Sequence, residues 1–259
     1  MLLSHVCGLS RVQLITCSEH TLSQVQAQQF STLLQQRLAG TPIAYLLGSR
    51  EFFGLNFKVT PDVLIPRPDT ELLVELALQY TPTNGQLLDL GTGSGAIAIA
   101  VGHTRSDIQV TASDISPAAL TVAKHNATTL LIDRAPLTFF TSDWYSQIPP
   151  QIFNTIVSNP PYIVKDDPHL DNGDLRFEPI NALTDHGDGL SAYRQIIQGA
   201  RSRLQDSGWL LMEHGYDQAE AVQALLRKNH FEQVTSWQDL AGIWRVTGAR
   251  YRASTEVLA

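Results

Sequence analysis

The sequence predicts an α/β fold with an open, mostly parallel sheet, preceded by a small helical region and a β-hairpin. From residue 86 onward, short apolar runs alternate with segments of helical periodicity, which is the pattern of consecutive strand–helix–strand units. The apolar runs are bounded by Gly, Pro and Asp, as strands in such units are. Before residue 41, by contrast, the apolar residues follow helical spacing only.

Length and composition narrow the class of protein. The 259 residues suit one α/β domain with an appendage, and the apolar fraction of 43% is typical of a soluble globular chain. The net charge of −7 argues against non-specific electrostatic binding of nucleic acid. No apolar run approaches the roughly 20 residues that span a bilayer, and the first residues lack the features of a signal peptide. The two cysteines, Cys7 and Cys17, cannot form a four-ligand zinc site or a disulfide framework. We therefore expect a cytoplasmic protein without a metal.

The first 40 residues predict a helical domain. Apolar residues recur at helical spacing in 2–9 and again in 22–38. Thr21 followed by Gln24 predicts a capping box for the second segment. The first apolar run starts directly at Met1 without a capping residue, so this domain could be truncated. We expect it to serve in packing or in substrate recognition.

Residues 41–68 predict a hairpin and a linker. The stretch 51–60 alternates around a glycine and reads as two short strands. Prolines at positions 66 and 68 then hold the chain extended. Arg67, between them, either forms a local salt bridge, which we favour, or reaches into a site. Asp69 or Thr70 is expected to cap the helix that follows.

The α/β domain is assigned to residues 69–259. Seven apolar runs predict its strands, at 87–90, 108–114, 137–140, 152–157, 209–213, 231–235 and 243–247. Ser116 and Pro117 open a helix as cap and first residue, and further helices are expected over 188–204 and 217–229. The polar segment 163–187 predicts a long irregular loop of the kind that forms lids or recognition loops.

A glycine-rich turn follows the first strand and predicts a cofactor site. Its residues, 91–95, read Gly-Thr-Gly-Ser-Gly and lead into a helix, so backbone can approach a ligand beside the positive helix end. Asp114 lies about 20 residues further on, where an acid accepts hydrogen bonds from ribose hydroxyls, although it could also cap the helix at Ser116. These features predict an adenosine-containing cofactor, either a nicotinamide or S-adenosylmethionine.

Three further residues bear on that choice. Asp89, inside the first strand, could meet the sulfonium or ammonium of S-adenosylmethionine, or could orient the glycine turn. Asp143 and Trp144, at the end of the third strand, suit adenine as an acceptor for its amino group and a flat face for stacking. Trp144 could equally be a core aromatic residue.

The stretch Asn159-Pro160-Pro161-Tyr162 carries the predicted chemistry. The prolines end the fourth strand, and the chain leaves the sheet at the carboxyl edge, where open α/β sheets bind ligands. The Asn159 side-chain oxygen and the Pro160 carbonyl could accept both hydrogens of a planar –NH2 group, and Tyr162 could stack on it. These acceptors suit the amino group of adenine and the amide of glutamine equally. The alternative interpretation is that the stretch is only an ordinary exit from a strand. Glu213, like its neighbour His214, is expected to be a packing or rim residue.

Five segments together resemble the HemK/PrmC family, which methylates peptide chain release factors with S-adenosylmethionine. They are Leu-Ile-Pro-Arg-Pro-Asp-Thr-Glu (64–71), Asp-Leu-Gly-Thr-Gly-Ser-Gly (89–95), Ser-Asp-Trp (142–144), Ser-Asn-Pro-Pro-Tyr (158–162) and Arg-Phe-Glu-Pro (176–179). The resemblance implies a class I, Rossmann-like methyltransferase with a seven-stranded mostly parallel sheet. It also implies methyl transfer to the glutamine side-chain amide of a Gly-Gly-Gln motif.

The resemblance also implies roles for individual residues. Asn159, Pro160 and Tyr162 are the expected catalytic residues, and Pro161 joins them in holding the substrate. The expected cofactor contacts are Gly91, Thr92, Gly93, Ser94, Gly95, Asp114, Asp143, Trp144 and Asn159.

Two other functions compete with this interpretation. An adenine-amino methyltransferase acting on DNA or RNA would need a basic groove beside Asn159. A non-catalytic cofactor-binding module would need a broken site, whereas Asn159 and the glycines are intact. We expect a monomer whose partners are release factors, with no membrane, no metal and no nucleic-acid substrate.

Overall fold

The computed structural model describes residues 1–16, 19 and 21–253. Its main sheet has seven strands in the order β5-β4-β3-β6-β7-β9-β8. Their bounds are β3 (Gln86–Leu90), β4 (Gln109–Asp114), β5 (Thr138–Thr141), β6 (Phe153–Ser158), β7 (Leu204–Glu213), β8 (Glu232–Gln238) and β9 (Trp244–Arg250). Neighbours pair in parallel except at β9, which is antiparallel to β7 and β8. The predicted fold class is confirmed.

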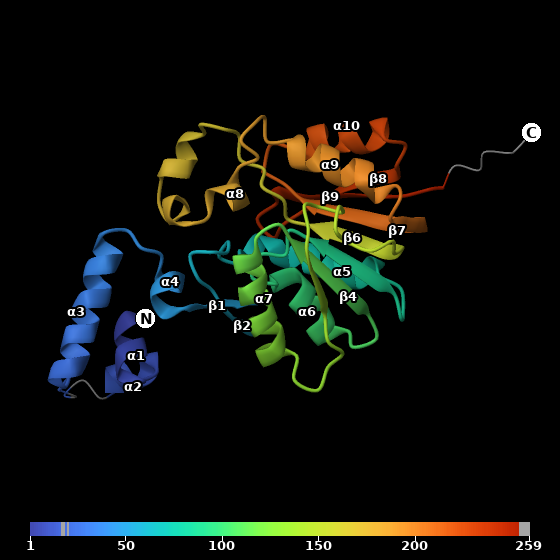
Figure 1. Ribbon diagram of the computed structural model, residues 1–259. Helices are drawn as coiled ribbons and strands as arrows, with labels where there is room; N and C mark the ends of the chain where they lie inside the picture. Colours follow the sequence, from blue (N-terminus) through green and yellow to red (C-terminus); the bar gives the residue numbers. More distant parts are fainter. Residues whose placement is uncertain (17–18, 20, 254–259) are drawn as a thin grey trace, which may run out of the picture.

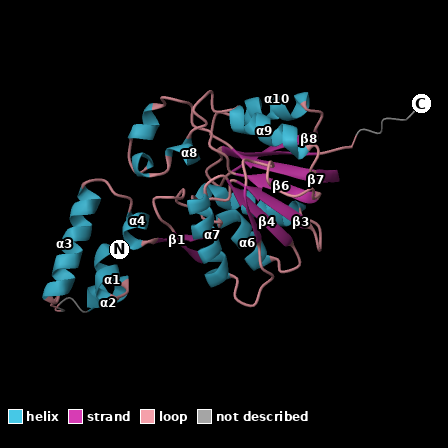
Figure 2. Cartoon of the chain, viewed as in Figure 1, coloured by secondary structure: helices cyan, strands magenta, loops and turns pink. Residues whose placement is uncertain are grey.

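Helices cover both faces of this sheet, giving three layers (Figure 2). One face packs on α5 (Glu71–Tyr80) and α6 (Ala96–Thr104), beside α7 (Pro117–Leu130); the other packs on α9 (Ser191–Ala200) and α10 (Ala219–Lys228). Alternate strand residues serve the two cores: Leu87, Val157 and Leu211 on the first side, Leu88, Ile156 and Met212 on the second. Burial on both sides is why these strands read as continuous apolar runs.

The order of the strands creates a switch point between β3 and β6. From β3 the chain moves outward to β4 and β5, and then returns to place β6 on the other side of β3. Ligands of open α/β sheets bind at such a point, beyond the carboxyl ends of the strands. Both the glycine turn and the Asn159 stretch leave the sheet at this place.

The N-terminal region stands apart from the sheet (Figure 1). It contains α1 (Leu2–Cys7), α2 (Arg11–Thr16), α3 (Gln24–Leu38) and α4 (Ile43–Leu47), followed by the hairpin of β1 (Ser49–Phe52) and β2 (Leu55–Lys58). The hairpin prediction is confirmed. The predicted capping box is wrong by two residues, because Ser23 and Gln26, not Thr21 and Gln24, bond reciprocally at the start of α3. Cys7 is a half-buried free thiol, and Cys17 lies outside the described residues.

The segment after Tyr162 is irregular, as predicted, apart from short helical turns. They are η2 (Pro168–Asp171), η3 (Leu175–Phe177) and α8 (Ile180–Leu183). This segment contacts the N-terminal helices, since Arg37 of α3 forms a 2.9 Å ion pair with Asp174. The domain boundaries at residues 40 and 68 remain predictions.

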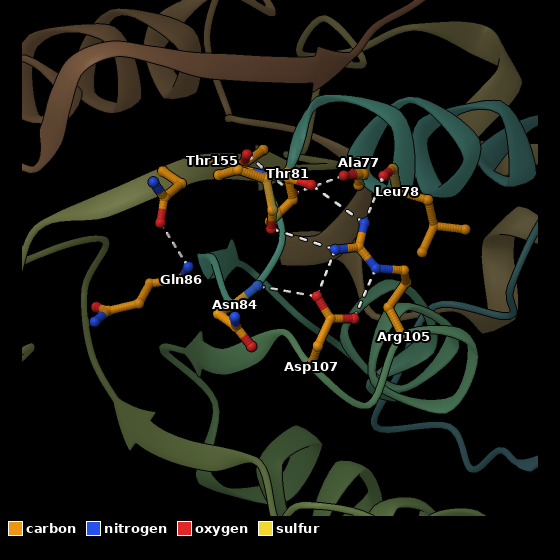
Figure 3. Close-up of polar contacts among 10 residues, drawn as sticks. Ala77, Leu78, Thr81, Asn84, Gln86, Arg105, Asp107 and Thr155 are labelled. Carbon is orange, nitrogen blue, oxygen red and sulfur yellow. Dashed lines mark hydrogen bonds and ion pairs between the residues drawn. The ribbon is translucent and has the colours of Figure 1, made fainter.

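Near the amino ends of the strands, Arg105 makes a cluster of hydrogen bonds and an ion pair (Figure 3). Its guanidinium donates to the carbonyl oxygens of Leu78 and Thr81, near the end of α5, and pairs with Asp107 at 2.6 Å. A cation at a helix C-terminus satisfies free carbonyls and complements the helix dipole. These contacts of Arg105 therefore join α5 to the start of β4. They lie at the amino ends of the strands, whereas the switch point lies at the carboxyl ends.

In the part of the chain that the structure describes, no helix combines the length and apolar character needed to cross a membrane.

Candidate active site

The site is built where β3 and β6 end side by side. Their parallel register pairs Asp89 with Val157 and Leu90 with Ser158. The Ser158 hydroxyl donates to the Leu90 carbonyl oxygen at 2.7 Å and ties the two strand ends together. The glycine turn begins at the next residue of β3, and Asn159 is the next residue of β6. The two predicted motifs are therefore neighbours in space, although 68 residues separate Leu90 from Ser158.

The glycine turn needs glycine for two different reasons. Gly93 has φ +55° and its missing side chain would meet open space, so the turn leaves its backbone accessible to a ligand. Gly95 has φ +84°, and a Cβ atom there would lie 2.7 Å from Ile99. The first glycine thus allows close approach of a ligand, and the second allows α6 to pack on the turn. The Thr92 hydroxyl and the Ser94 side chain are buried within the protein.

Asp89 supports the turn from beneath and keeps one oxygen free. Its Oδ2 accepts the Thr92 hydroxyl at 2.6 Å and the Ala98 amide at 3.3 Å. Its Oδ1 is buried and, among the described residues, has no hydrogen-bond partner. Burial raises the pKa of this carboxyl to about 7. An unpaired carboxylate oxygen beside the glycine turn is suited to a cationic group of a ligand.

Asp114 lies at the end of β4 and closes the turn from the side. Its Oδ2 accepts the Gly93 amide and its Oδ1 accepts the Ser116 amide, both at 2.9 Å. The carboxylate therefore holds the turn and also bonds the N-cap residue of α7, while its contact with ribose hydroxyls stays a prediction. Burial raises its pKa. The remaining lone pairs can still accept from a ligand hydroxyl.

Trp144 lies next to the glycine turn with a left-handed backbone at φ +45°. A side chain added at Gly91 would come within 3.9 Å of the Trp144 ring. The ring is half-buried against the second core, so it is partly a core aromatic and partly a wall of the site. The Asp143 side chain beside it is exposed.

The Asn159 stretch leaves the sheet beside the glycine turn. The Asn159 amide nitrogen donates to the Thr70 hydroxyl at 3.3 Å. Pro160 is buried, and no described donor bonds its carbonyl oxygen. The Tyr162 carbonyl oxygen accepts from Gln218 at 3.0 Å, which fixes the exit of the loop. Burial, with the Glu213 carboxyl nearby, raises the pKa of the Tyr162 phenol, which stays neutral.

The structure adds three polar side chains that the sequence had assigned elsewhere. Thr70 makes no capping hydrogen bond with its side chain, so the expected cap is wrong. Asp69 instead pairs with Arg245 of β9 at 3.0 Å, and Thr70 contacts Asn159. Glu213, expected to be a packing or rim residue, is buried beside Asn159 and Thr70, and burial raises its pKa to about 7. The one local signal was an acid at the end of an otherwise apolar strand.

His214 behaves as the sequence predicts. Its Nε2 bonds the Thr247 hydroxyl and its Nδ1 bonds the Gly215 carbonyl oxygen, both at 2.8 Å. With both ring nitrogens engaged and its pKa lowered by burial, it is a neutral packing residue.

Arg67 makes the salt bridge that we favoured, although with a distant partner. It pairs with Glu178, whose side chain is fully buried and also accepts the Ile65 amide at 2.9 Å. This pair joins the proline-rich linker to the segment after Tyr162. The Arg67 charge also lies close enough to the Tyr162 phenol to act on its pKa, in the lowering direction.

Among the described residues, no group of three or more His, Cys, Asp or Glu side chains could hold a metal ion.

Comparisons with known proteins agree with this arrangement. Residues 1–48 match the PrmC N-terminal domain, and residues 68–173 match the methyltransferase small domain. A release factor glutamine methyltransferase of Burkholderia pseudomallei is 52% identical over 257 residues, covering 96% of this chain and 90% of the relative. One from Bordetella pertussis is 50% identical over 251 residues, covering 96% and 92%. A methyltransferase structure from Pyrococcus furiosus, 16% identical, covers 86% of this chain and 100% of its own, with a TM-score of 0.60. The last comparison supports the fold alone.

Proposed function

This chain belongs to the release factor glutamine methyltransferases, and on that premise we propose that S-adenosylmethionine is its methyl donor and a Gly-Gly-Gln glutamine its acceptor. The protein is an enzyme that methylates the glutamine side-chain amide of peptide chain release factors. The observation that carries the site assignment is the pairing of Leu90 with Ser158, which brings the glycine turn and Asn159 together.

The residues around the turn fit S-adenosylmethionine. The free, buried Oδ1 of Asp89 complements an ammonium or sulfonium group. Asp114, already oriented by two backbone amides, can accept from ribose hydroxyls. Trp144 offers a ring face beside Gly91 for adenine, and the exposed Asp143 offers an acceptor. When bound, the cofactor supplies an electrophilic methyl group carried on positively charged sulfur.

Asn159 and Pro160 orient the nucleophile. The Asn159 Oδ1 atom and the Pro160 carbonyl oxygen accept the two N–H groups of the glutamine amide, and Tyr162 packs against its planar face. An amide nitrogen is a weak nucleophile because its lone pair is delocalised. Catalysis therefore depends mainly on holding the nitrogen in line with the methyl carbon. Orientation of this kind can lower the activation free energy by several kcal/mol.

Charge balance follows from the same contacts. The amide nitrogen would accept the methyl group from the cofactor, which would leave as the neutral thioether. Positive charge develops on the nitrogen, where the two oxygen acceptors stabilise it. The nitrogen would then release one proton to solvent water, and the side chain would leave as a neutral N-methyl amide.

The proposed assignment is tested with methyl-labelled cofactor and two acceptors, a release factor and mixed nucleic acid. We expect label on the release factor, on the glutamine of Gly-Gly-Gln, and none on nucleic acid. Methylation of nucleic acid alone would overturn the assignment and favour the adenine-amino alternative.

Asn159→Ala should keep the fold and lower kcat by about tenfold to a hundredfold, because it removes one oriented acceptor. Asn154→Ala is the matched control, since Asn154 lies at the opposite end of β6 and, among the described residues, its side chain bonds only the Gln86 amide. We expect that control to retain its turnover. Full activity of Asn159→Ala on a release factor would contradict the role of Asn159.

A further inference from the structure

Glu213, the last residue of β7, lies beside Asn159, the first residue after β6. The β6–β7 register ends with Ser158 opposite Met212, so Asn159 and Glu213 occupy the next position on the two strands. The Glu213 side chain is 2% exposed, and its Oε2 has no hydrogen-bond partner among the residues described. A buried acid with an unpaired oxygen is costly for folding, and such costly groups cluster at functional sites. The mechanism above makes no use of it.

The Asn159 side-chain amide has an NH2 group that donates hydrogen bonds and an oxygen that accepts them, and the neighbouring residues favour one orientation of the two. Its NH2 group donates to the Thr70 hydroxyl at 3.3 Å, and the Glu213 carboxyl lies close enough to Thr70 and Asn159 for both to lower its pKa. An ionised carboxylate is an acceptor only, so it can face the NH2 group but not the oxygen of an amide. With the NH2 group directed at Thr70 and Glu213, the Oδ1 atom is left for another donor.

We propose that ionised Glu213, together with Thr70, positions the Asn159 side chain so that its oxygen, and not its NH2 group, faces the substrate glutamine. Both are positioning residues that act through Asn159. The inference rests on the proposed function, because it assumes that Asn159 accepts an N–H group of the glutamine amide.

This arrangement makes the site sensitive to protonation of Glu213. A protonated carboxyl can donate a hydrogen bond to the Asn159 oxygen, which allows the amide to turn and present a donor to the substrate. Burial raises the pKa of Glu213 to about 7, so this change falls near neutral pH. Activity should therefore rise with pH through an ascending limb near pH 7.

The groups around Glu213 shift that limb in opposite directions. The Thr70 hydroxyl and the Arg245 guanidinium favour the ionised carboxylate and lower its pKa, whereas the Asp69 carboxylate raises it. The neighbouring phenols of Tyr162 and Tyr193 have raised pKa values and stay neutral across this range. Removing Thr70 or Asp69 should thus move the limb to higher or lower pH respectively.

The test is the pH profile of kcat/KM for the release factor between pH 6 and 9, at saturating cofactor. Saturation prevents Asp89, whose pKa burial also raises to about 7, from shaping the profile. In the wild type we expect an ascending limb. Glu213→Gln should flatten the limb and lower kcat roughly tenfold at pH 8.5, since a neutral amide no longer selects one orientation of Asn159.

Two further variants keep the test decisive if Glu213→Gln fails to fold, which its melting temperature would show. Thr70→Val should move the limb to higher pH, and Asp69→Asn should move it to lower pH. A purely structural role would change the rate without moving the limb. An unchanged limb in the folded variants, or no limb in the wild type, overturns the proposal.

The outcomes separate this inference from the proposed function. If the wild type does not methylate release factors at any pH, the proposed function fails. If it does, and the limb behaves independently of residues 213, 70 and 69, the proposed function stands and the positioning role of Glu213 is refuted.

Discussion

Replacing Asp89 with asparagine should stabilise the cofactor-free protein at pH 8. The folded chain binds a proton at Asp89 more tightly than the unfolded chain does, because burial raises its pKa from 3.8 to about 7. The free energy of unfolding therefore falls as pH rises between these two values. A difference of about three pH units corresponds to an upper value of roughly 4 kcal/mol.

Asparagine removes that cost and introduces a smaller one. Its oxygen can still accept from Thr92 and Ala98, but its NH2 group takes the place of the unpaired Oδ1. A buried donor without a partner costs about 1–3 kcal/mol. The net gain at pH 8 is therefore about 1–3 kcal/mol, or roughly 2–12 °C in melting temperature for a chain of this size.

Thermal unfolding of the cofactor-free protein from pH 4 to pH 8 measures this effect. Asp89→Asn should flatten the decline of stability over that range, and its affinity for S-adenosylmethionine, measured by calorimetry, should fall. Asp107→Asn provides a control of opposite sign, since Arg105 and the Asn84 amide lower the pKa of Asp107. That carboxylate stabilises the fold above its unfolded pKa of 3.8, so Asp107→Asn should be less stable than the wild type throughout the range from pH 4 to pH 8. An Asp89→Asn protein that is less stable at pH 8, with an unchanged slope, would refute the reasoning.

Two further changes probe the glycine turn and the Arg67–Glu178 pair. Gly95→Ala should lower the melting temperature and weaken cofactor binding, because the new Cβ atom would lie 2.7 Å from Ile99 at φ +84°; strain of this kind costs about 1–3 kcal/mol. Gly93→Ala meets open space and should be milder in stability, so equal melting temperatures for the two variants would count against this account. Arg67→Met leaves the buried Glu178 carboxylate without its ion-pair partner and should cost about 3–5 kcal/mol in urea unfolding. The double variant Arg67→Met/Glu178→Leu should recover part of this loss, and additive losses would argue that the two residues do not interact.

Local patterns predicted the features that depend on near neighbours. The Ser116–Pro117 start of α7 forms as expected, with the Ser116 side chain accepting the Ala119 amide, because a cap needs only its own first turn. The start of α3 shows the limit of such patterns. Thr21 with Gln24 and Ser23 with Gln26 both match a capping box, and only the second is used. Which one forms depends on where the helix begins, and packing of the whole N-terminal region decides that.

Local patterns could not predict contacts between segments that are distant in the sequence. Asp69 and Thr70 look like caps when only the next residues are considered, yet their partners are Arg245 and Asn159, from β9 and the end of β6. Glu213 looks like the rim of an apolar strand because nothing nearby in the chain reveals that β7 lies beside β6. Alternating burial specifies the two faces of a strand, but it does not specify which strand lies next to it.

The sequence by itself determined the α/β class and the place of the glycine turn, and it predicted the roles of Asp114, Asn159 and Pro160, because each follows from residue type and short spacing. Its resemblance to a family chose glutamine over adenine, and the comparisons support that choice. Only the tertiary structure decided that β3 and β6 end together and that Thr70 and Glu213 surround the Asn159 amide. These relations arise from the order and register of strands, which are set by packing across the whole sheet rather than by any local stretch of chain.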